Sequence, residues 1–269
     1  MKEKLLFLVI CSLLPLAGEA IITTNNTNAA TDPSGINGFN WNYVVNFNGS
    51  SSVAVDPYWL LTAAHVADDF GNTSVTVNGQ TYNQVGEVYH ATADLALVKL
   101  DRALSGFYAI YSGTYPTASK NRLSAIMAGY GVTGTVVDQY NYTFGSSGKG
   151  TERWGSNKID GQLNYIGGTG KTNSGFLMYF NTADSSLEAG AGTGDSGGGV
   201  FVSDGGVWKL AGIMTDISTG SSQDAILAVN VQDYSSWITQ TVPEPTTGIL
   251  LVGIGIVFGV IKRLRYMYQ

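Results

Sequence analysis

Short runs of alternating apolar residues recur along the middle of this chain, and turn residues such as glycine and asparagine separate them. Runs of this kind at short intervals are typical of strands and predict an all-β sandwich or barrel. The composition agrees, because 35 glycines, 15 tyrosines and only 13% charged residues indicate a sheet protein with many turns. The clearest runs are Tyr43–Phe47, Ser52–Val55, Ser74–Val77, Gly86–Tyr89, Asp94–Leu100, Ser124–Ala128, Gly175–Phe180 and Val207–Met214.

Helical periodicity is restricted to two short segments. One is the turn that follows His65, and the other is Val231–Thr239. In the second segment the bulky apolar residues Tyr234, Trp237 and Ile238 recur at the spacing of one helical face. We therefore expect an all-β domain with a short helix near its C-terminal end.

Charge and cysteine content exclude several classes of protein. The net charge is −6, and the body of the chain contains no cluster of lysine and arginine, which argues against nucleic acid as a partner. The only cysteine, Cys11, lies in an N-terminal apolar run. If that run is removed, a disulfide framework and a thiolate metal site are both excluded. The sequence implies no metal and no cofactor.

Residues 1–20 have the features of a signal peptide. A charged start is followed by an apolar core over Leu5–Leu16, and Gly18-Glu19-Ala20 places small residues where signal peptidase requires them. We expect this segment to be removed and the rest of the chain to be exported.

A second targeting segment is expected over residues 242–269. Pro243-Glu244-Pro245 precedes Thr246–Ile261, which carries no charge, and the basic cluster Lys262-Arg263-Leu264-Arg265 follows. A helix over residues 246–261 would span about 24 Å, slightly less than the ~30 Å hydrocarbon core of a bilayer. This predicts a membrane contact through residues 246–261, with the basic end in the cytoplasm.

These three parts, in this order, resemble the PEP-CTERM sorting signal of Gram-negative bacteria. The resemblance implies recognition by an exosortase-type sorting enzyme and cleavage near Pro243-Glu244-Pro245. It also implies that the protein is anchored transiently in the membrane and is then released to the cell surface or to an extracellular matrix.

The stretch Gly194-Asp195-Ser196-Gly197-Gly198 fits two catalytic motifs, the G-x-S-x-G turn of α/β-hydrolases and the G-D-S-G-G loop of trypsin-like proteases. A serine hydroxyl needs a base, usually histidine, and the chain contains only His65 and His90. Both histidines precede Ser196, whereas an α/β-hydrolase places its histidine after its serine. The α/β-hydrolase interpretation is therefore excluded.

The remaining order is histidine, aspartate, serine. Asp94 opens an apolar strand, where a desolvated carboxylate needs a strong donor such as an imidazole N–H. We expect His65 as the general base, Asp94 as the group that orients it, and Ser196 as the nucleophile. The backbone N–H groups of Gly194 and Ser196 are expected to form an oxyanion hole. His90 is expected to be non-catalytic.

Three blocks of sequence resemble the signature blocks of chymotrypsin/trypsin-like serine proteases, in the order of that family. They are Thr62-Ala63-Ala64-His65, Asp94-Leu95-Ala96-Leu97 and Gly194-Asp195-Ser196-Gly197-Gly198. The resemblance implies two six-stranded antiparallel β-barrels over residues 21–241, with a junction near residue 131. It also implies a serine endopeptidase that hydrolyses protein or peptide substrates through an acyl-enzyme. The alternative is a surface or matrix binding protein that keeps the protease fold without turnover.

The same resemblance assigns a pocket for the residue before the scissile bond, called P1. It places Gly190 at the base of the pocket and Thr215 and Ile217 on its wall. Because Gly190 is no carboxylate, a preference for Arg or Lys is not expected. Ile217 replaces a glycine of the family and narrows the pocket, which predicts a small or medium apolar P1 residue.

Asp195 matches the acid that pairs, in this family, with a freed N-terminus. Removal of residues 1–20 would expose Ile21 as the new N-terminus. One interpretation is that export itself creates the activating contact between Ile21 and Asp195. The alternative is a disordered leader, with Asp195 held by other donors.

Overall fold

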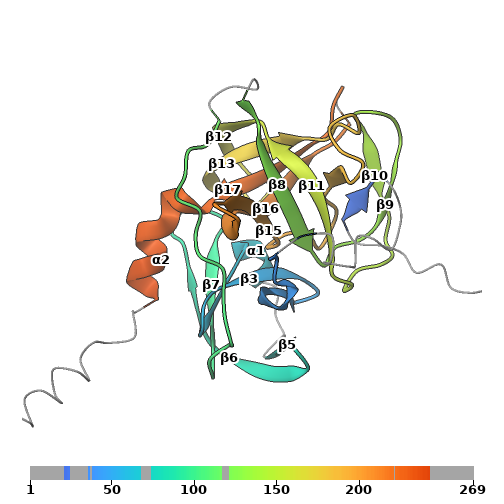
Figure 1. Ribbon diagram of the computed structural model, residues 1–269. Helices are drawn as coiled ribbons and strands as arrows, with labels where there is room; N and C mark the ends of the chain where they lie inside the picture. The colour runs from blue at the N-terminus through green and yellow to red at the C-terminus, as the bar shows by residue number, and fades with distance from the viewer. Residues whose placement is uncertain are drawn as a thin grey trace, which may run out of the picture.

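The computed structural model of the chain describes residues 21–24, 36, 38–67, 74–116, 121–220 and 222–242. Figure 1 shows that these residues form two antiparallel sheets with short helices beside them. The expected signal peptide, residues 1–20, and the expected sorting segment beyond Val242 lie outside the described residues. Within those described ranges, no helix is long and apolar enough to cross a membrane.

The first sheet comes from the N-terminal half of the domain and has six strands. They are β2 (Val44–Phe47), β3 (Ser50–Asp56), β4 (Trp59–Thr62), β5 (Ser74–Val77), β6 (Gln80–Tyr89) and β7 (Ala96–Leu100). Their order is β2-β3-β4-β7-β6-β5, and β2 also contacts β5, which brings the two ends of the sheet together. The pairs Asn48-Gly49 and Asn78-Gly79 connect β2 to β3 and β5 to β6. Both residues of each pair have positive φ, as a type I′ hairpin turn requires.

The second sheet comes from the C-terminal half and has seven strands. They are β8 (Leu123–Gly129), β11 (Arg153–Ile159), β12 (Gly161–Ile166), β13 (Thr172–Tyr179), β15 (Gly199–Asp204), β16 (Val207–Ser218) and β17 (Ala225–Asn230). Their order is β11-β8-β15-β16-β17-β13-β12, and β11 also contacts β13. This second sheet has one strand more than the expected six. Because β8 belongs to it, the chain crosses between the sheets before Leu123.

Shorter elements complete the domain. They are β1 (Ile22–Thr23), which pairs with β14 (Ala189–Gly190); β9 (Gly134–Val136), which pairs with β10 (Tyr142–Phe144); and the helical segments η3 (Trp41–Tyr43), α1 (Ala64–Ala67), η5 (Val231–Tyr234) and α2 (Ser235–Thr241). The turn expected after His65 is α1. The expected C-terminal helix begins as the 3-10 turn η5, where the Asn230 side chain accepts the Gln232 N–H, and continues as α2.

One apolar core continues across the junction between the two sheets. The rings of Phe39 and Tyr108 contact the ring of Phe201 in β15, at centroid distances of 4.9 Å and 4.5 Å respectively. All three side chains are buried, and burying each contributes about 1.5–3 kcal/mol. β3 of the first sheet also contacts β8 and β15 of the second sheet. The relative position of the two sheets is therefore set by close packing.

Candidate active site

His65 and Asp94 lie together because their segments follow and precede paired strands. Thr62, at the end of β4, pairs with Ala96, at the start of β7. His65, in α1, comes three residues after the end of β4, and Asp94 comes two residues before the start of β7. His65 Nδ1 lies 2.7 Å from Asp94 Oδ2, and the backbone N–H of His65 donates to Asp94 Oδ1 at 3.0 Å.

Both sheets hold Asp94. Its side chain is only 1% exposed, so its carboxylate depends on donors from the protein. The backbone N–H of Asp94 donates to Oδ1 of the buried Asn173 in β13 at 2.8 Å. The carboxylate in turn favours a proton on Nδ1 of His65, which leaves Nε2 as the ring nitrogen that can accept one.

Ser196 lies in a tight loop between β14 and β15. Gly194 and Gly197 flank it with φ values of 95° and 83°, which glycine adopts without strain. The backbone N–H groups of Asp195, Gly197 and Gly198 donate to backbone oxygens. Those of Gly194 and Ser196 make no hydrogen bond to any residue that the structure describes. These two groups are therefore available to a ligand at the serine.

Ser51 in β3 holds this loop from the first sheet, although it belongs to none of the sequence motifs described above. Its backbone N–H donates to the Ser196 carbonyl oxygen at 3.1 Å, and its Oγ donates to the Gly194 carbonyl oxygen at 2.9 Å. The Oγ also accepts the Tyr130 N–H at 2.9 Å. The available signal was the serine run Ser50–Ser52 beside an apolar strand, because a buried hydroxyl needs hydrogen-bond partners.

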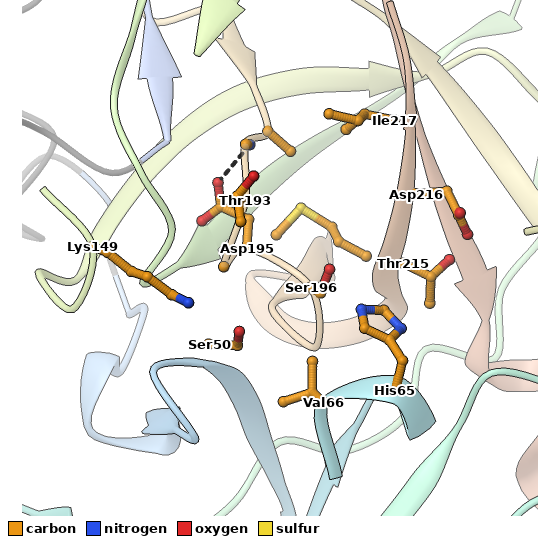
Figure 2. A pocket seen from close by; sticks show the side chains of 14 residues that line it. Ser50, His65, Val66, Lys149, Thr193, Asp195, Ser196, Thr215, Asp216 and Ile217 are labelled. Carbon is orange, nitrogen blue, oxygen red and sulfur yellow. Dashed lines mark hydrogen bonds between the residues drawn. The ribbon is translucent and has the colours of Figure 1, made fainter. Parts of the chain in front are cut away.

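A pocket with a volume of about 350 Å³ opens beside Ser196 and His65, as Figure 2 shows. Thr215 and Ile217, from the end of β16, are among its lining residues. Met214 adds an apolar surface to the same wall. The pocket therefore combines an apolar wall with the two residues that were expected to be nucleophile and base.

Gly190, expected at the base of the pocket, is not among its lining residues. It is buried in β14, where its partner is Ile22 of β1. The ring of Tyr142 occupies the space that a side chain at Gly190 would need. Tyr142 is buried, burial raises its pKa, and its hydroxyl accepts the Ala191 N–H at 3.2 Å. The Tyr142 ring thus fills the space beside Gly190 in β14.

Asp195 is 1% exposed, and its carboxylate accepts the backbone N–H groups of Gly131 and Gly192, both at 2.9 Å. Burial raises the pKa of Asp195 to about 7. The two hydrogen bonds, the charge of Arg153 and the backbone N–H of Ile21 lower this pKa and partly offset burial. Ile21 is 1% exposed and packs into the core of the second sheet. Ile21 and Asp195 are therefore neighbours.

His90 lies in a different environment. Its Nδ1 accepts the Ala93 N–H at 3.0 Å, and its ring packs edge-on against Tyr234 and Trp237 at centroid distances of 4.8 Å and 5.1 Å. These contacts assign His90 a structural role between a turn and the C-terminal helical segment. In the part of the chain that the structure describes, no group of three or more His, Cys, Asp or Glu side chains could hold a metal ion.

Comparisons with solved structures agree with this architecture. The chain is similar to Rv3671c from M. tuberculosis H37Rv in an inactive form, with 14% identity over 78% of this chain and 94% of that one, and a TM-score of 0.55. It is also similar to the passenger domain of plasmid encoded toxin, an autotransporter enterotoxin from enteroaggregative Escherichia coli. There the identity is 17% over 74% of this chain and 22% of that one, and the TM-score is 0.54. At such identities the likeness supports the fold alone.

Family models match nearly the whole chain after its first residues. The model described as trypsin matches residues 30–238, and the model described as the PEP-CTERM protein-sorting motif matches residues 241–265. No curated protein matches the chain. The two-barrel architecture expected from the sequence agrees with these matches. The chain therefore belongs to the trypsin family of serine proteases and carries a PEP-CTERM protein-sorting motif near its C-terminal end.

Proposed function

We propose that this protein is an exported serine endopeptidase with Ser196, His65 and Asp94 as its catalytic triad. The observation that carries the proposal is the 2.7 Å contact between His65 Nδ1 and Asp94 Oδ2, at the edge of a pocket that Ser196 also lines. A base that a buried carboxylate orients, beside a serine, is what nucleophilic acyl transfer requires.

In the acylation step, Ser196 Oγ attacks the carbonyl carbon of the peptide bond while His65 Nε2 accepts the hydroxyl proton. Asp94 stabilises the imidazolium that forms. The N–H groups of Gly194 and Ser196 donate to the oxyanion of the tetrahedral intermediate, and such donors contribute about 3–4 kcal/mol each. His65 then gives its proton to the leaving nitrogen, the C–N bond breaks, and an acyl-enzyme remains.

The deacylation step uses the same groups. His65 takes a proton from a water molecule, whose oxygen adds to the acyl carbon. The ester bond then breaks, and the proton passes from His65 to Ser196 Oγ. The carboxylic acid product leaves and the free enzyme is regenerated.

The apolar wall of the pocket supports a small or medium apolar P1 residue. Met214 and Ile217 line the pocket beside Ser196, and Ala191 and Gly192 add small residues to it. Gly190 itself supplies no carboxylate, and the Tyr142 ring fills the space that a side chain there would need. A P1 Arg or Lys would therefore find no charged partner at Gly190, and the Asp216 carboxylate in the pocket already accepts the Gly168 N–H.

We further propose that signal-peptide removal activates the enzyme. Cleavage after Ala20 would turn the backbone N–H of Ile21 into a charged α-amino group beside Asp195. Because burial disfavours the carboxylate of Asp195, a cation at this place would stabilise its charged form. Asp195 directly precedes Ser196, so the ion pair would hold the loop that carries the nucleophile and the oxyanion donors.

Export and sorting complete the proposal. The PEP-CTERM motif over residues 241–265 supports recognition by an exosortase-type enzyme. We place cleavage near Pro243-Glu244-Pro245, after a transient membrane contact through residues 246–261. The enzyme would then act on protein or peptide substrates at the cell surface or in the extracellular matrix of a Gram-negative bacterium.

A fluorophosphonate probe tests the catalytic proposal, because it labels only an activated serine. The purified wild-type protein should be labelled and should cleave casein. Ser196→Ala should lose labelling and at least about a thousandfold of the activity. Ser203→Ala, on the exposed end of β15, is the matched control and should behave like wild type. A folded wild-type protein that is never labelled would favour the binding-protein alternative.

A further inference from the structure

Lys149 lies in the loop between β10 and β11, and its side chain lines the same pocket as Ser196 and His65. Its Cε covers the α-carbon of Gly194, because a Cβ built on Gly194 would lie 2.9 Å from Cε. Its Nζ lies beside the hairpin turn of the first sheet, 3.8 Å from a Cβ built on Gly49. Figure 2 shows the ammonium group pointing from the loop towards Ser50 and the pocket.

The ammonium group of Lys149 has no ion pair or hydrogen bond with any residue that the structure describes. Two other lysines differ in this respect. Lys158 Nζ lies 3.0 Å from Asp184 Oδ1, and Lys209 Nζ lies 2.7 Å from Asp204 Oδ2. The Lys149 side chain is also exposed. Its charge is therefore available to a ligand that enters the pocket.

Lys149 and the apolar wall lie on opposite sides of the serine. In Figure 2, Thr215, Asp216 and Ile217 are on one side of Ser196, and Lys149 is on the other. A peptide whose scissile bond lies at Ser196 must leave the serine in two opposite directions. The acyl part occupies the apolar wall in the proposed function. The leaving part must therefore pass Lys149.

A carboxylate on the acyl side of the pocket strengthens this asymmetry. Asp216 lies on the acyl side, and its Oδ1 accepts the Gly168 N–H at 2.8 Å. A carboxylate on the substrate would be repelled by Asp216 on the acyl side and attracted by Lys149 on the leaving side. Both charges therefore favour the same orientation of an acidic substrate, with its carboxylate on the leaving side.

We propose that Lys149 is a specificity-determining residue that selects a carboxylate on the leaving side of the scissile bond. The substrate carries Asp or Glu at the first or second residue after the cleaved bond, and the side-chain carboxylate pairs with Lys149 Nζ. This inference rests on the proposed function of Ser196. Because the pair is exposed to solvent, its effect weakens as ionic strength rises.

The test compares quenched fluorescent peptides that differ only after the scissile bond and that end in an amide. The purified exported protein should cleave peptides with Glu at the first or second position about two- to fivefold faster, in kcat/KM, than peptides with Gln. The preference should shrink in 1 M salt. Lys149→Gln should bring the ratio of kcat/KM on Glu peptides to that on Gln peptides to one, and Lys149→Glu should bring it below one. Lys209→Gln, remote from the pocket, is the matched charge control and should keep the wild-type ratio.

Four results would overturn the proposal. Equal rates on the Glu and Gln peptides would remove the role of Lys149 while leaving the peptidase itself in place. A p-nitroanilide substrate has no residue after the scissile bond. If Lys149→Gln lowered kcat/KM on this substrate as much as on the Glu peptides, the charge of Lys149 would act on the oxyanion instead. If Gln peptides ending in a free terminal carboxylate gained as much as Glu peptides, a chain terminus would be the ligand. Absence of cleavage on every peptide would overturn the proposed function together with this inference.

Discussion

Glu188 shows how a single buried acid can control stability. Its side chain is 0% exposed, and its Oε1 accepts the Asn181 N–H at 3.1 Å. Its Oε2 has no hydrogen-bond partner among the described residues. The neighbouring cations Arg122 and Lys158 are paired with Asp184. Burial therefore dominates, and it raises the pKa of Glu188 to about 8.

The raised pKa predicts that Glu188 makes stability depend on pH. The native state keeps the proton up to about pH 8, whereas the unfolded chain releases it near the ordinary value of 4.5. The contribution of Glu188 is therefore fully present below pH 4.5 and is lost as pH rises towards 8. Urea unfolding between pH 5 and pH 9 should show a decline on the order of a few kcal/mol.

Glu188→Gln should make this decline shallower, because the amide keeps the oxygen that accepts from Asn181 and does not titrate. The decline that remains comes from Asp195 and Glu152, whose pKa values burial also raises. Glu87→Gln on the exposed face of β6 is the matched control and should keep the wild-type slope. Equal slopes in wild type and Glu188→Gln would contradict the prediction.

At the scale of elements, the end of β16 and the loop before β15 supply most of the residues that line the pocket. A β-bulge interrupts the pairing of β16 with β17 between Met214 and Asp216, directly at the pocket wall. Ile217 follows the bulge, lines the pocket and packs against the core of the second sheet. In the proposed function, the size of the P1 residue is therefore limited by one side chain that the core of the second sheet supports.

A library of peptides that differ at P1 tests this view of the pocket. Ala and Val at P1 should be preferred over Phe, and Arg or Lys should be poor. Ile217→Gly should raise the kcat/KM ratio of Phe over Ala peptides about tenfold, because it removes the bulk that narrows the wall. Ile166→Gly on exposed β12 is the matched control. A clear preference of the wild type for Arg would contradict the assignment.

At the scale of the whole molecule, the candidate site depends on segments that are far apart in the sequence. His65 and Ser51 come from the first sheet, while Asn173 and the Ser196 loop come from the second sheet and its connections. β1 joins them from the start of the described chain, because Ile22 pairs with Gly190. This pairing brings Ile21 to Asp195. The first described residues are thus coupled to the loop that holds Ser196.

Activation by export predicts that the N-terminal charge controls activity. A protein that begins at Ile21 should be active, and one that keeps Ala20 should lose activity on the order of a hundredfold, because a buried ion pair is broken. Activity of the first protein should fall as pH rises through the pKa of its amine, ordinarily about 8, since the neutral amine cannot pair with Asp195.

Chemical acetylation of the Ile21 amine removes the charge without adding a residue, and it should reproduce the loss. Rates of peptide hydrolysis and fluorophosphonate labelling both report the outcome. Full activity with Ala20 retained would show that Gly131, Gly192 and Arg153 suffice to hold Asp195.

The sequence by itself determined the all-β class, the family and the identity of the candidate triad. Alternating apolar runs report strands locally, and two histidines that both precede Ser196 exclude one fold and leave another. These signals are local or depend only on order along the chain. They can therefore be recognised without knowing which residues are in contact.

Only the tertiary structure showed what surrounds these residues. Ser51 and Lys149 reach the Ser196 loop from distant segments, and Tyr142 fills the space behind Gly190. Glu188 acquires its raised pKa only when the core closes around it. Such contacts depend on how two sheets pack, and packing is a property of three-dimensional distance that spacing along the chain does not encode.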